Sequence, residues 1–268
     1  LMMTLNILLR IFKLATNVGA MSSSGLKTMN IQIMTKDNKQ QKHLDSTDTA
    51  IAYSTCYVQP FSEVFNEDCI AVMKRYPDKY FDLAVVDPPY GIGANKMQLG
   101  NGKKKIYRGE NDWDNSIPTA EYWQELFRVS KNQIVWGGNY YELKPSKCWL
   151  VWDKNNGDSD FADGEMAWTS FDKPMRIKKI HWCGSAPKWE DTNGKIHPTQ
   201  KPVKLYDWIF SEFTKEGDLV LDTHLGSASS RISANKAKLR FVGCEIDAKY
   251  FNDGEARFKE FGSQLRFF

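Results

Sequence analysis

The stretch of this sequence with the most constrained backbone is Asp87-Pro88-Pro89-Tyr90, which directly follows the apolar run FDLAVV. A residue before proline is pushed towards extended geometry, and proline fixes its own φ. The Asp87 carboxylate and the Pro88 carbonyl can therefore be held as two acceptors that converge on one point. Two fixed acceptors suit an NH2 group, which has two N–H donors. We therefore interpret the stretch as a rigid socket for an amino group.

An exocyclic base amine is the group that such a socket suits best. Its nitrogen is a poor nucleophile, because its lone pair is delocalised into the ring. When both of its hydrogens are accepted, a pyramidal nitrogen is favoured and its lone pair faces an electrophile. The Tyr90 ring could stack on the same base, and such stacking is worth roughly 1–3 kcal/mol.

A second motif, LVLDTHLGSASS, has the form of a nucleotide-binding turn. Asp222 ends an apolar strand, Gly226 makes a tight turn, and Ser227 is among the small residues that open a helix. The next predicted strand ends at Glu245, where an acid can accept both hydroxyls of a ribose. This stretch has neither the GxGxxG pattern of dinucleotide enzymes nor a P-loop lysine, which argues against a dehydrogenase and against ATP hydrolysis.

The third motif is HPTQKP, residues 197–202, which stands just before a predicted helix. Its two prolines hold an extended segment, in which Thr199, Gln200 and Lys201 offer donors. Lys201 could meet a ligand carboxylate. Taken alone, the motif is more simply a rigid lead-in to the helix.

Together and in this order, DPPY, HPTQKP, DTHLGSAS and FVGCEID resemble the β-class DNA amino-methyltransferases. In that family the catalytic motif precedes the S-adenosylmethionine motif, a circular permutation of the usual methyltransferase order. The resemblance covers about residues 58–262, and KNQIVWGGNYY and FADGEMAWTSF are also similar to phage and bacterial members. It implies an α/β fold with a Rossmann-like, doubly wound, mostly parallel sheet. It also implies S-adenosylmethionine as cofactor and double-stranded DNA as substrate.

The resemblance assigns roles to individual residues. It implies that the flipped target base is held by Asp87, Pro88, Pro89 and Tyr90. It implies cofactor binding by Asp222, Gly226 and Ser227 around the methionine part, Glu245 on the ribose, His197, Thr199 and Lys201 near the carboxylate, and Asp68 near the adenine.

Two positions bear on how far the resemblance extends. Asp rather than Ser at position 87 favours adenine N6 over cytosine N4 as the target. The family pattern usually reads Gly-Ser-Gly where this chain has Gly226, Ser227 and Ala228. We expect the Ala228 methyl group to be tolerated if φ is negative there. The leading hypothesis is a site-specific DNA adenine-N6 methyltransferase that flips its target base.

Three alternatives remain open at this point. A cytosine-N4 DNA methyltransferase would have the same fold and chemistry. Methyltransferases of RNA or protein glutamine can carry a similar motif, but typically as Asn-Pro-Pro-Tyr after the cofactor motif, so the motif order and Asp87 count against them. A DNA-binding pseudoenzyme that has lost its cofactor affinity could result from Ala228, although Asp87 and Glu245 are intact.

Strands and helices alternate along the chain, as expected for an α/β fold with a parallel sheet. The continuous apolar run before Asp87 predicts a strand that is covered on both faces. We expect a methyltransferase domain over residues 58–268, in which residues 153–196 read the target sequence. Residues 1–57 are polar towards their end and are expected to be a poorly ordered extension.

Charge says little overall, since the formal net charge is +3, but two segments are basic and interleaved with aromatics. Such segments can follow a phosphate backbone, although two solvated surface loops are an equally good interpretation on charge alone. The candidate DNA-binding residues are Lys103, Lys104, Lys105, Arg108, Arg176, Lys178 and Lys179.

The remaining expectations concern setting and partners. The five cysteines are scattered and form no CxxC pair, so we expect neither a disulfide framework nor a metal site. The N-terminal apolar run is interrupted by Arg10 and Lys13 and is too short and too charged to span a membrane. We expect a cytoplasmic protein of a bacterial or phage-infected cell, and the family makes a homodimer plausible.

Overall fold

The computed structural model describes residues 61–93, 114, 116–156, 162–182, 196–197 and 199–264. These residues all belong to one compact unit, Cys56–Phe268. The predicted N-terminal extension (residues 1–57) lies outside the described residues, as do the candidate DNA-binding residues Lys103, Lys104, Lys105 and Arg108.

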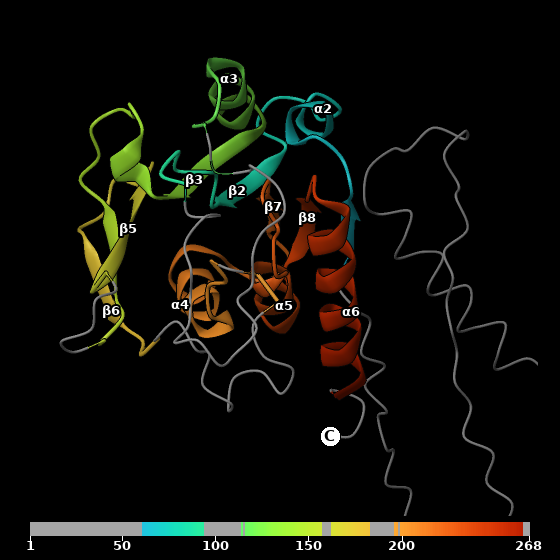
Figure 1. Cartoon of the computed structure of the whole chain (residues 1–268). Coiled ribbons are helices and arrows are strands. Elements are labelled where there is room, and N and C mark those ends of the chain that lie inside the picture. Colours follow the sequence, from blue (N-terminus) through green and yellow to red (C-terminus); the bar gives the residue numbers. More distant parts are fainter. Residues whose placement is uncertain are drawn as a thin grey trace, which may run out of the picture. The chain divides into compact units, whose positions relative to one another are not determined.

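The described residues form an eight-stranded sheet in the order β1-β8-β7-β2-β3-β5-β4-β6 (Figure 1). Only β5 runs antiparallel to its neighbours, β3 and β4, and every other pairing in this sheet is parallel. The strands are β1 (Ser62–Phe65), β2 (Phe81–Val86), β3 (Ser130–Trp136), β4 (Trp149–Asp153), β5 (Gly164–Thr169), β6 (Arg176–Lys179), β7 (Leu219–Asp222) and β8 (Arg240–Cys244).

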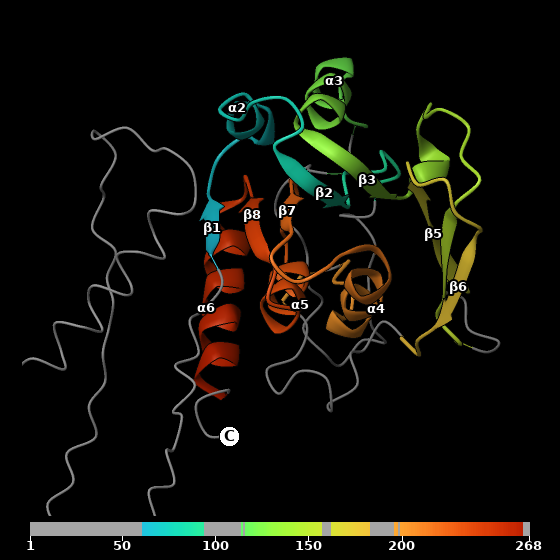
Figure 2. The ribbon, with the colours of Figure 1, turned by 180° about the vertical axis from the view of Figure 1, so that it is seen from behind.

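Helices cover both faces of this sheet (Figures 1 and 2). One face carries α2 and α3, and the other carries α4, α5 and α6. Their bounds are α2 (Cys69–Met73), α3 (Ala120–Val129), α4 (Val203–Phe213), α5 (Ser229–Lys236) and α6 (Ala248–Gln264), and a short 3-10 helix, η2, spans Gly138–Tyr140. The predicted α/β fold with a doubly wound, mostly parallel sheet is confirmed.

The last part of β2, Leu83–Val86, shows why four successive residues are apolar. Leu83 and Val85 pack into the core on the side of α4 and α5, whereas Ala84 and Val86 pack on the side of α3. Successive side chains of a strand point to opposite faces, so a strand between two helical layers needs apolar residues at every position.

Two helices begin at side-chain caps that fix where the preceding loops end. Asp68 accepts a hydrogen bond from the Ala71 N–H (3.0 Å) and starts α2. Thr119 accepts one from the Tyr122 N–H (3.3 Å) and starts α3. Such caps satisfy donors that the first helical turn leaves unpaired.

The sheet has a switch point between β7 and β2, which lie side by side. The chain leaves β7 towards α5 on one face and leaves β2 towards α3 on the other (Figures 1 and 2). In open α/β sheets, ligands bind at such points, outside the carboxyl ends of the strands. Among the described residues, no helix has the length and apolar character needed to cross a membrane.

Candidate active site

Three carboxylates lie at the carboxyl ends of adjacent strands at this switch point. Asp87 follows β2, Asp222 ends β7 and Glu245 follows β8. Burial raises the pKa of Asp222 to about 7, and the charges of Asp87 and Glu245 act in the same direction. The three groups are therefore close enough to influence one another, and the two predicted motifs meet at one edge of the sheet.

The turn after Asp87 is held in place by a buried acid from another segment. Asp114 Oδ1 accepts hydrogen bonds from the backbone N–H groups of Tyr90 (2.7 Å) and Gly91 (2.9 Å). Gly91 has φ +72°, a conformation that favours glycine. The Tyr90 hydroxyl turns back and donates to Asp87 Oδ1 (2.6 Å). Asp114 thus holds the backbone of the turn that follows Asp87, and the Tyr90 hydroxyl holds the Asp87 carboxylate.

The second predicted acceptor, the Pro88 carbonyl, is held by a tyrosine. The Tyr141 hydroxyl lies 2.8 Å from the Pro88 oxygen and 3.0 Å from the Pro89 oxygen and donates to them. Burial raises the pKa of Tyr141 well above its ordinary value, so the hydroxyl stays protonated and remains a donor. Each carbonyl oxygen has two lone pairs, so the Pro88 carbonyl can still accept a ligand N–H.

Two residues of the segment that follows β3 contact the Tyr90 ring. It stacks on Tyr140, with ring centroids 4.9 Å apart and an angle of 15° between the planes. A Cβ at Gly137 would overlap the Tyr90 ring, and Gly137 also has φ +66°. Glycine is therefore required at this position for two independent reasons. The ring that we expect to stack on a base has one aromatic neighbour already in place.

Lys201 lies at the Asp87 carboxylate. Its Nζ is 2.5 Å from Asp87 Oδ2 and 3.0 Å from Glu165 Oε2, and it donates to the Tyr90 hydroxyl at 3.3 Å. The Lys201 side chain is only 4% exposed. Burial alone would lower its pKa, but Asp87 and Glu165 outweigh burial and raise it. The resemblance implies that this ammonium lies near a ligand carboxylate, whereas in the structure two protein carboxylates engage it.

The Gly226 turn joins two of the predicted cofactor residues. Gly226 has φ +49°, and its N–H donates to Glu245 Oε2 (2.9 Å). The His197 ring lies against Gly226, where a Cβ would meet the ring at 3.6 Å, and packs edge-on against the Tyr250 ring at 4.3 Å. Residues from the HPTQKP segment, the turn and α6 therefore line one place.

The Asp222 carboxylate is buried beneath this turn. Its Oδ1 accepts from the His224 N–H (3.0 Å), and its Oδ2 accepts from the Ser230 hydroxyl (2.5 Å). These hydrogen bonds favour the charged form, but burial is the larger effect and leaves the pKa at about 7. A cationic ligand beside Asp222 would favour its ionised form.

The other predicted cofactor residues lie around the same edge. Asp68 follows β1, whose neighbour in the sheet is β8. Thr199 contacts the His197 ring through its hydroxyl, 3.2 Å from Nδ1. The Ser227 hydroxyl is 3.0 Å from that of Ser229, and the Ser227 carbonyl accepts from Arg257 (2.6 Å).

Ala228 does not have the conformation that its methyl group would favour. The Ala228 methyl group is expected to be tolerated if φ is negative, but φ is +59° and ψ is 22° at the start of α5. This left-handed conformation strains a residue with a Cβ. Gly254 of α6 faces it and leaves room for the Ala228 methyl group. The condition for an unstrained alanine is therefore not met.

The candidate DNA-binding residues that the structure describes lie on β6. Arg176, Lys178 and Lys179 are exposed on this edge strand. A groove of about 580 Å³ next to β6 is lined by Lys178, Lys179, Ile180, His181, Lys204, Asp207, Trp208, Ser211 and Glu212. Its lysines outnumber its acids, which suits a phosphate backbone.

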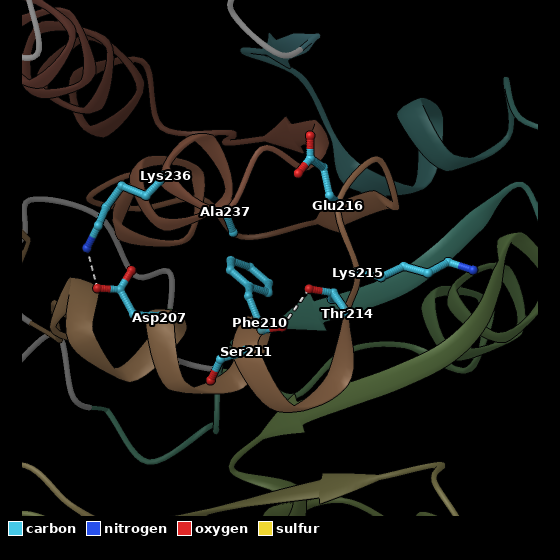
Figure 3. Close-up of a pocket in the computed structure, with 8 residues that line it drawn as sticks. All are labelled: Asp207, Phe210, Ser211, Thr214, Lys215, Glu216, Lys236 and Ala237. Carbon is cyan, nitrogen blue, oxygen red and sulfur yellow. Dashed lines mark hydrogen bonds and ion pairs between the residues drawn. The ribbon is translucent and has the colours of Figure 1, made fainter.

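A second groove, of about 400 Å³ (Figure 3), lies near the amino end of β7, away from the carboxyl ends of the strands. It lies between α4 and α5, and Lys215 and Glu216, which line it, precede β7. Asp222 stands at the other end of that strand. Phe210 points across the groove towards Ala237 (Figure 3). The groove is therefore separate from the three carboxylates. Among the described residues, no cluster of His, Cys, Asp or Glu is arranged to hold a metal ion.

Sequence reasoning missed four residues of the socket. They are Asp114, Tyr140, Tyr141 and Glu165. The segments KNQIVWGGNYY and FADGEMAWTSF were noted for their resemblance, but no local spacing singles out these side chains. Pairing of β5 with β3 and β4, which the sequence does not reveal, brings Glu165 to Lys201.

The chain was compared with known proteins. Residues 168–256 match the N6_N4_Mtase family model, described as DNA methylase. Over these residues the chain is similar to the N6/N4 DNA methylases. It is 25% identical over 212 residues to YubD of Escherichia coli (strain K12), which is named as a methylase, covering 73% of this chain and 89% of that protein. It is 23% identical over 244 residues to the type II methyltransferase M.HinfI of Haemophilus influenzae, covering 74% of this chain and 68% of that protein.

A crystal structure of an M1.HpyAVI–SAM complex is similar to the chain with a TM-score of 0.49 and 18% identity, covering 74% of this chain and all of that one. The DNA methylase match contains Lys201, Asp222 and Glu245. It does not include Asp87 or Tyr90. The role of those two residues therefore rests on the geometry of the socket.

Proposed function

We propose that this chain is a site-specific DNA methyltransferase of the β class, acting on N6 of an adenine flipped out of double-stranded DNA. The observation that carries the proposal is the position of the Asp87 socket on β2, directly beside the Asp222–Gly226 turn on β7. A site for a base amine and a site for a nucleotide-like cofactor thus share the switch point of the sheet.

The residues around Gly226 fit S-adenosylmethionine. The buried Asp222 carboxylate suits a cationic ligand, because its two hydrogen-bond donors, the His224 N–H and the Ser230 hydroxyl, are both uncharged. Glu245 accepts backbone N–H groups of Gly226 and Asp247 through different oxygens, both at 2.9 Å. Each carboxylate oxygen can accept again, so Glu245 can also take ribose hydroxyls. The His197 ring lies beside Gly226 and is placed to contact a ligand that this turn holds.

When bound, S-adenosylmethionine supplies an electrophilic methyl group on a positively charged sulfur. Asp87 and the Pro88 carbonyl would accept the two N–H groups of the base and turn the nitrogen lone pair towards the Gly226 turn. Transfer of this methyl group to the nitrogen would replace the C–S bond by an N–C bond, would leave the bonding electron pair on the sulfur, and would release one proton from the nitrogen. Asp87 accepts that N–H and is placed to receive the proton.

Base flipping costs a few kcal/mol, and the socket offers contacts that offset this cost. Tyr90 and Tyr140 provide aromatic surface, and stacking of a base is worth roughly 1–3 kcal/mol. Arg176, Lys178 and Lys179 are proposed to contact phosphates. Residues 153–196 are proposed to read the target sequence, because β6 and one wall of the groove beside it, formed by Lys178, Lys179, Ile180 and His181, belong to this range.

Cytosine N4 is the second candidate target. The family model covers methylases of both amines. Both are exocyclic NH2 groups, so the same pair of acceptors suits either one. We favour adenine because position 87 is Asp rather than Ser.

The test is mass spectrometry of nucleosides from DNA incubated with the protein and S-adenosylmethionine carrying a ¹³C-methyl group. Labelled N6-methyladenine is the expected product. Labelled N4-methylcytosine would keep the chemistry and replace the target base. Unmodified DNA, together with retained DNA binding, would contradict the proposal and indicate a pseudoenzyme.

A further inference from the structure

Four charged side chains form an alternating series that begins at the catalytic socket. The series runs Asp87, Lys201, Glu165 and Lys154, with N–O separations of 2.5, 3.0 and 2.7 Å. The four residues come from four separate segments: the ends of β2 and β4, the lead-in to α4, and β5. Through these contacts, a shift of one of the four side chains can change the position of its neighbour in the series.

The series is shielded from water and each charge has a partner. The side chains are between 4% and 25% exposed. Burial would raise the pKa of Glu165, but Lys201 and Lys154 outweigh burial and lower it to about 2. Removing one partner of a buried ion pair leaves an uncompensated charge, which is strongly unfavourable.

Lys201 has little freedom to leave this series. Its Nζ lies 5.3 Å from the centroid of the Trp136 ring and 5.8 Å from that of the Tyr90 ring. Trp136 is fully buried. Among the described residues, the groups that engage the ammonium are the Asp87 and Glu165 carboxylates and the Tyr90 hydroxyl, with the two aromatic rings beside it.

The contact between Lys201 and Glu165 is an ion pair rather than an aligned hydrogen bond. Glu165 Oε2 lies 3.0 Å from Lys201 Nζ, yet among the described residues this oxygen has no partner of hydrogen-bond geometry. The Lys201–Asp87 contact is shorter and is aligned as a hydrogen bond. Glu165 therefore attracts Lys201 mainly by charge, against the stronger hold of Asp87.

We infer that Glu165 is a positioning residue for Asp87, acting through Lys201, and this inference rests on the proposed function. Because Glu165 also attracts the Lys201 ammonium, Lys201 does not form an ion pair with Asp87 alone, and the negative charge of Asp87 is not fully compensated. Asp87 then remains an acceptor for the base amine and can stabilise the positive charge that develops on the nitrogen. Without Glu165, Lys201 would pair with Asp87 alone and compete with the amine.

The test uses four forms of the full chain: wild type, Glu165→Gln, Lys154→Met and the double variant. Glu165→Gln removes the charge and keeps the shape, and we expect kcat to fall about 100-fold. The KM for S-adenosylmethionine should stay within about two-fold, since the affected interaction acts in the transition state. Lys154→Met removes the outer partner of Glu165 and strengthens its hold on Lys201, so kcat should not fall.

The double variant separates positioning from stability. It removes both Glu165 and Lys154, so neither is left without its partner, and its thermal unfolding midpoint should return towards that of the wild type. Its kcat should nevertheless stay as low as that of Glu165→Gln, because Lys201 still has only Asp87 as its carboxylate. A kcat that recovers together with the unfolding midpoint would show that Glu165 is merely structural.

Two further outcomes keep this inference distinct from the proposed function. An active wild type with unchanged kcat in Glu165→Gln would overturn the positioning role alone. An inactive wild type, with DNA and S-adenosylmethionine both bound, would overturn the proposed function and the positioning role with it. If Glu165→Gln does not fold, the double variant carries the same test.

Discussion

The Lys201 ammonium lies 2.5 Å from the Asp87 carboxylate, although 114 residues separate them in the sequence. The contact brings the HPTQKP segment to the end of β2, next to the predicted catalytic acid. The HPTQKP segment therefore contributes to two sites, because His197 lies at the Gly226 turn while Lys201 lies at the Asp87 socket. This arrangement places a residue expected at the cofactor in contact with the side chain that we propose to be catalytic.

Replacing Lys201 tests whether it acts on Asp87 or binds the cofactor. Lys201→Met keeps much of the aliphatic length and removes the charge. We expect kcat to fall about 100-fold, because Asp87 loses the group that holds its Oδ2. Affinity for S-adenosylmethionine, measured by calorimetry, should be unchanged. A large loss of affinity with kcat retained would instead show that Lys201 binds the cofactor carboxylate.

Ala228 offers a stabilising substitution. Because φ is +59°, Ala228→Gly should remove strain and raise the free energy of unfolding by about 1 kcal/mol. Ala234, a buried residue within α5, is the matched control, since Ala234→Gly should lower stability by roughly 1 kcal/mol. Urea titrations of the two variants should therefore shift in opposite directions. Destabilisation by both would show that the strain at Ala228 is not significant.

Asp222 should make stability depend on pH. Its pKa rises from 3.8 to about 7 on folding, chiefly through burial. Between these values the unfolded chain has lost the proton and the folded chain retains it. The free energy of unfolding should therefore fall as pH rises from about 4 to about 7. Asp222→Asn should remove this contribution, which is seen as the difference between the two proteins in urea titrations across this range.

The same group should couple cofactor binding to protons. A cationic ligand favours ionised Asp222, so S-adenosylmethionine should bind more tightly as pH rises towards 7, with release of a proton near pH 6. Calorimetry in buffers of different ionisation enthalpy measures that release directly. Equal proton release by wild type and Asp222→Asn would assign it to another group.

Gly137 tests whether the position of the Tyr90 ring matters for the reaction. Gly137→Ala would place a methyl group in the Tyr90 ring, in addition to straining the backbone. Gly217 is the matched control, because it also has positive φ but no atom lies within 4 Å of its added Cβ. We expect Gly137→Ala to lower kcat about 100-fold and Gly217→Ala to leave it unchanged, with both variants somewhat less stable. Wild-type kcat in Gly137→Ala would separate Tyr90 from catalysis.

Much of the fold could be predicted because its strands carry strong local signals. β2, β7 and β8 are apolar runs that end at Asp87, Asp222 and next to Glu245. Parallel strands bring their carboxyl ends to one edge, so the meeting of these three acids follows from the sequence pattern alone.

The support of the socket could not be predicted in the same way. The pairing of β5 with β4 brings Glu165 to the site and Lys154 to Glu165, and no motif in the sequence marks Asp114 as the acceptor for the Tyr90 and Gly91 N–H groups. The direction of Lys201 depends on which carboxylates tertiary packing brings near it. The sign of φ at Ala228 depends on the turn around it, which Gly254 accommodates from α6.

The most direct test of the account is single-turnover methyl transfer by Asp87→Ala, measured beside its affinity for S-adenosylmethionine. Lys201 keeps Glu165 as a partner in this variant, so the fold should survive. We predict at least a roughly 1,000-fold slower transfer with cofactor affinity unchanged. Transfer at the wild-type rate would contradict the claim that the end of β2 holds the reacting amine.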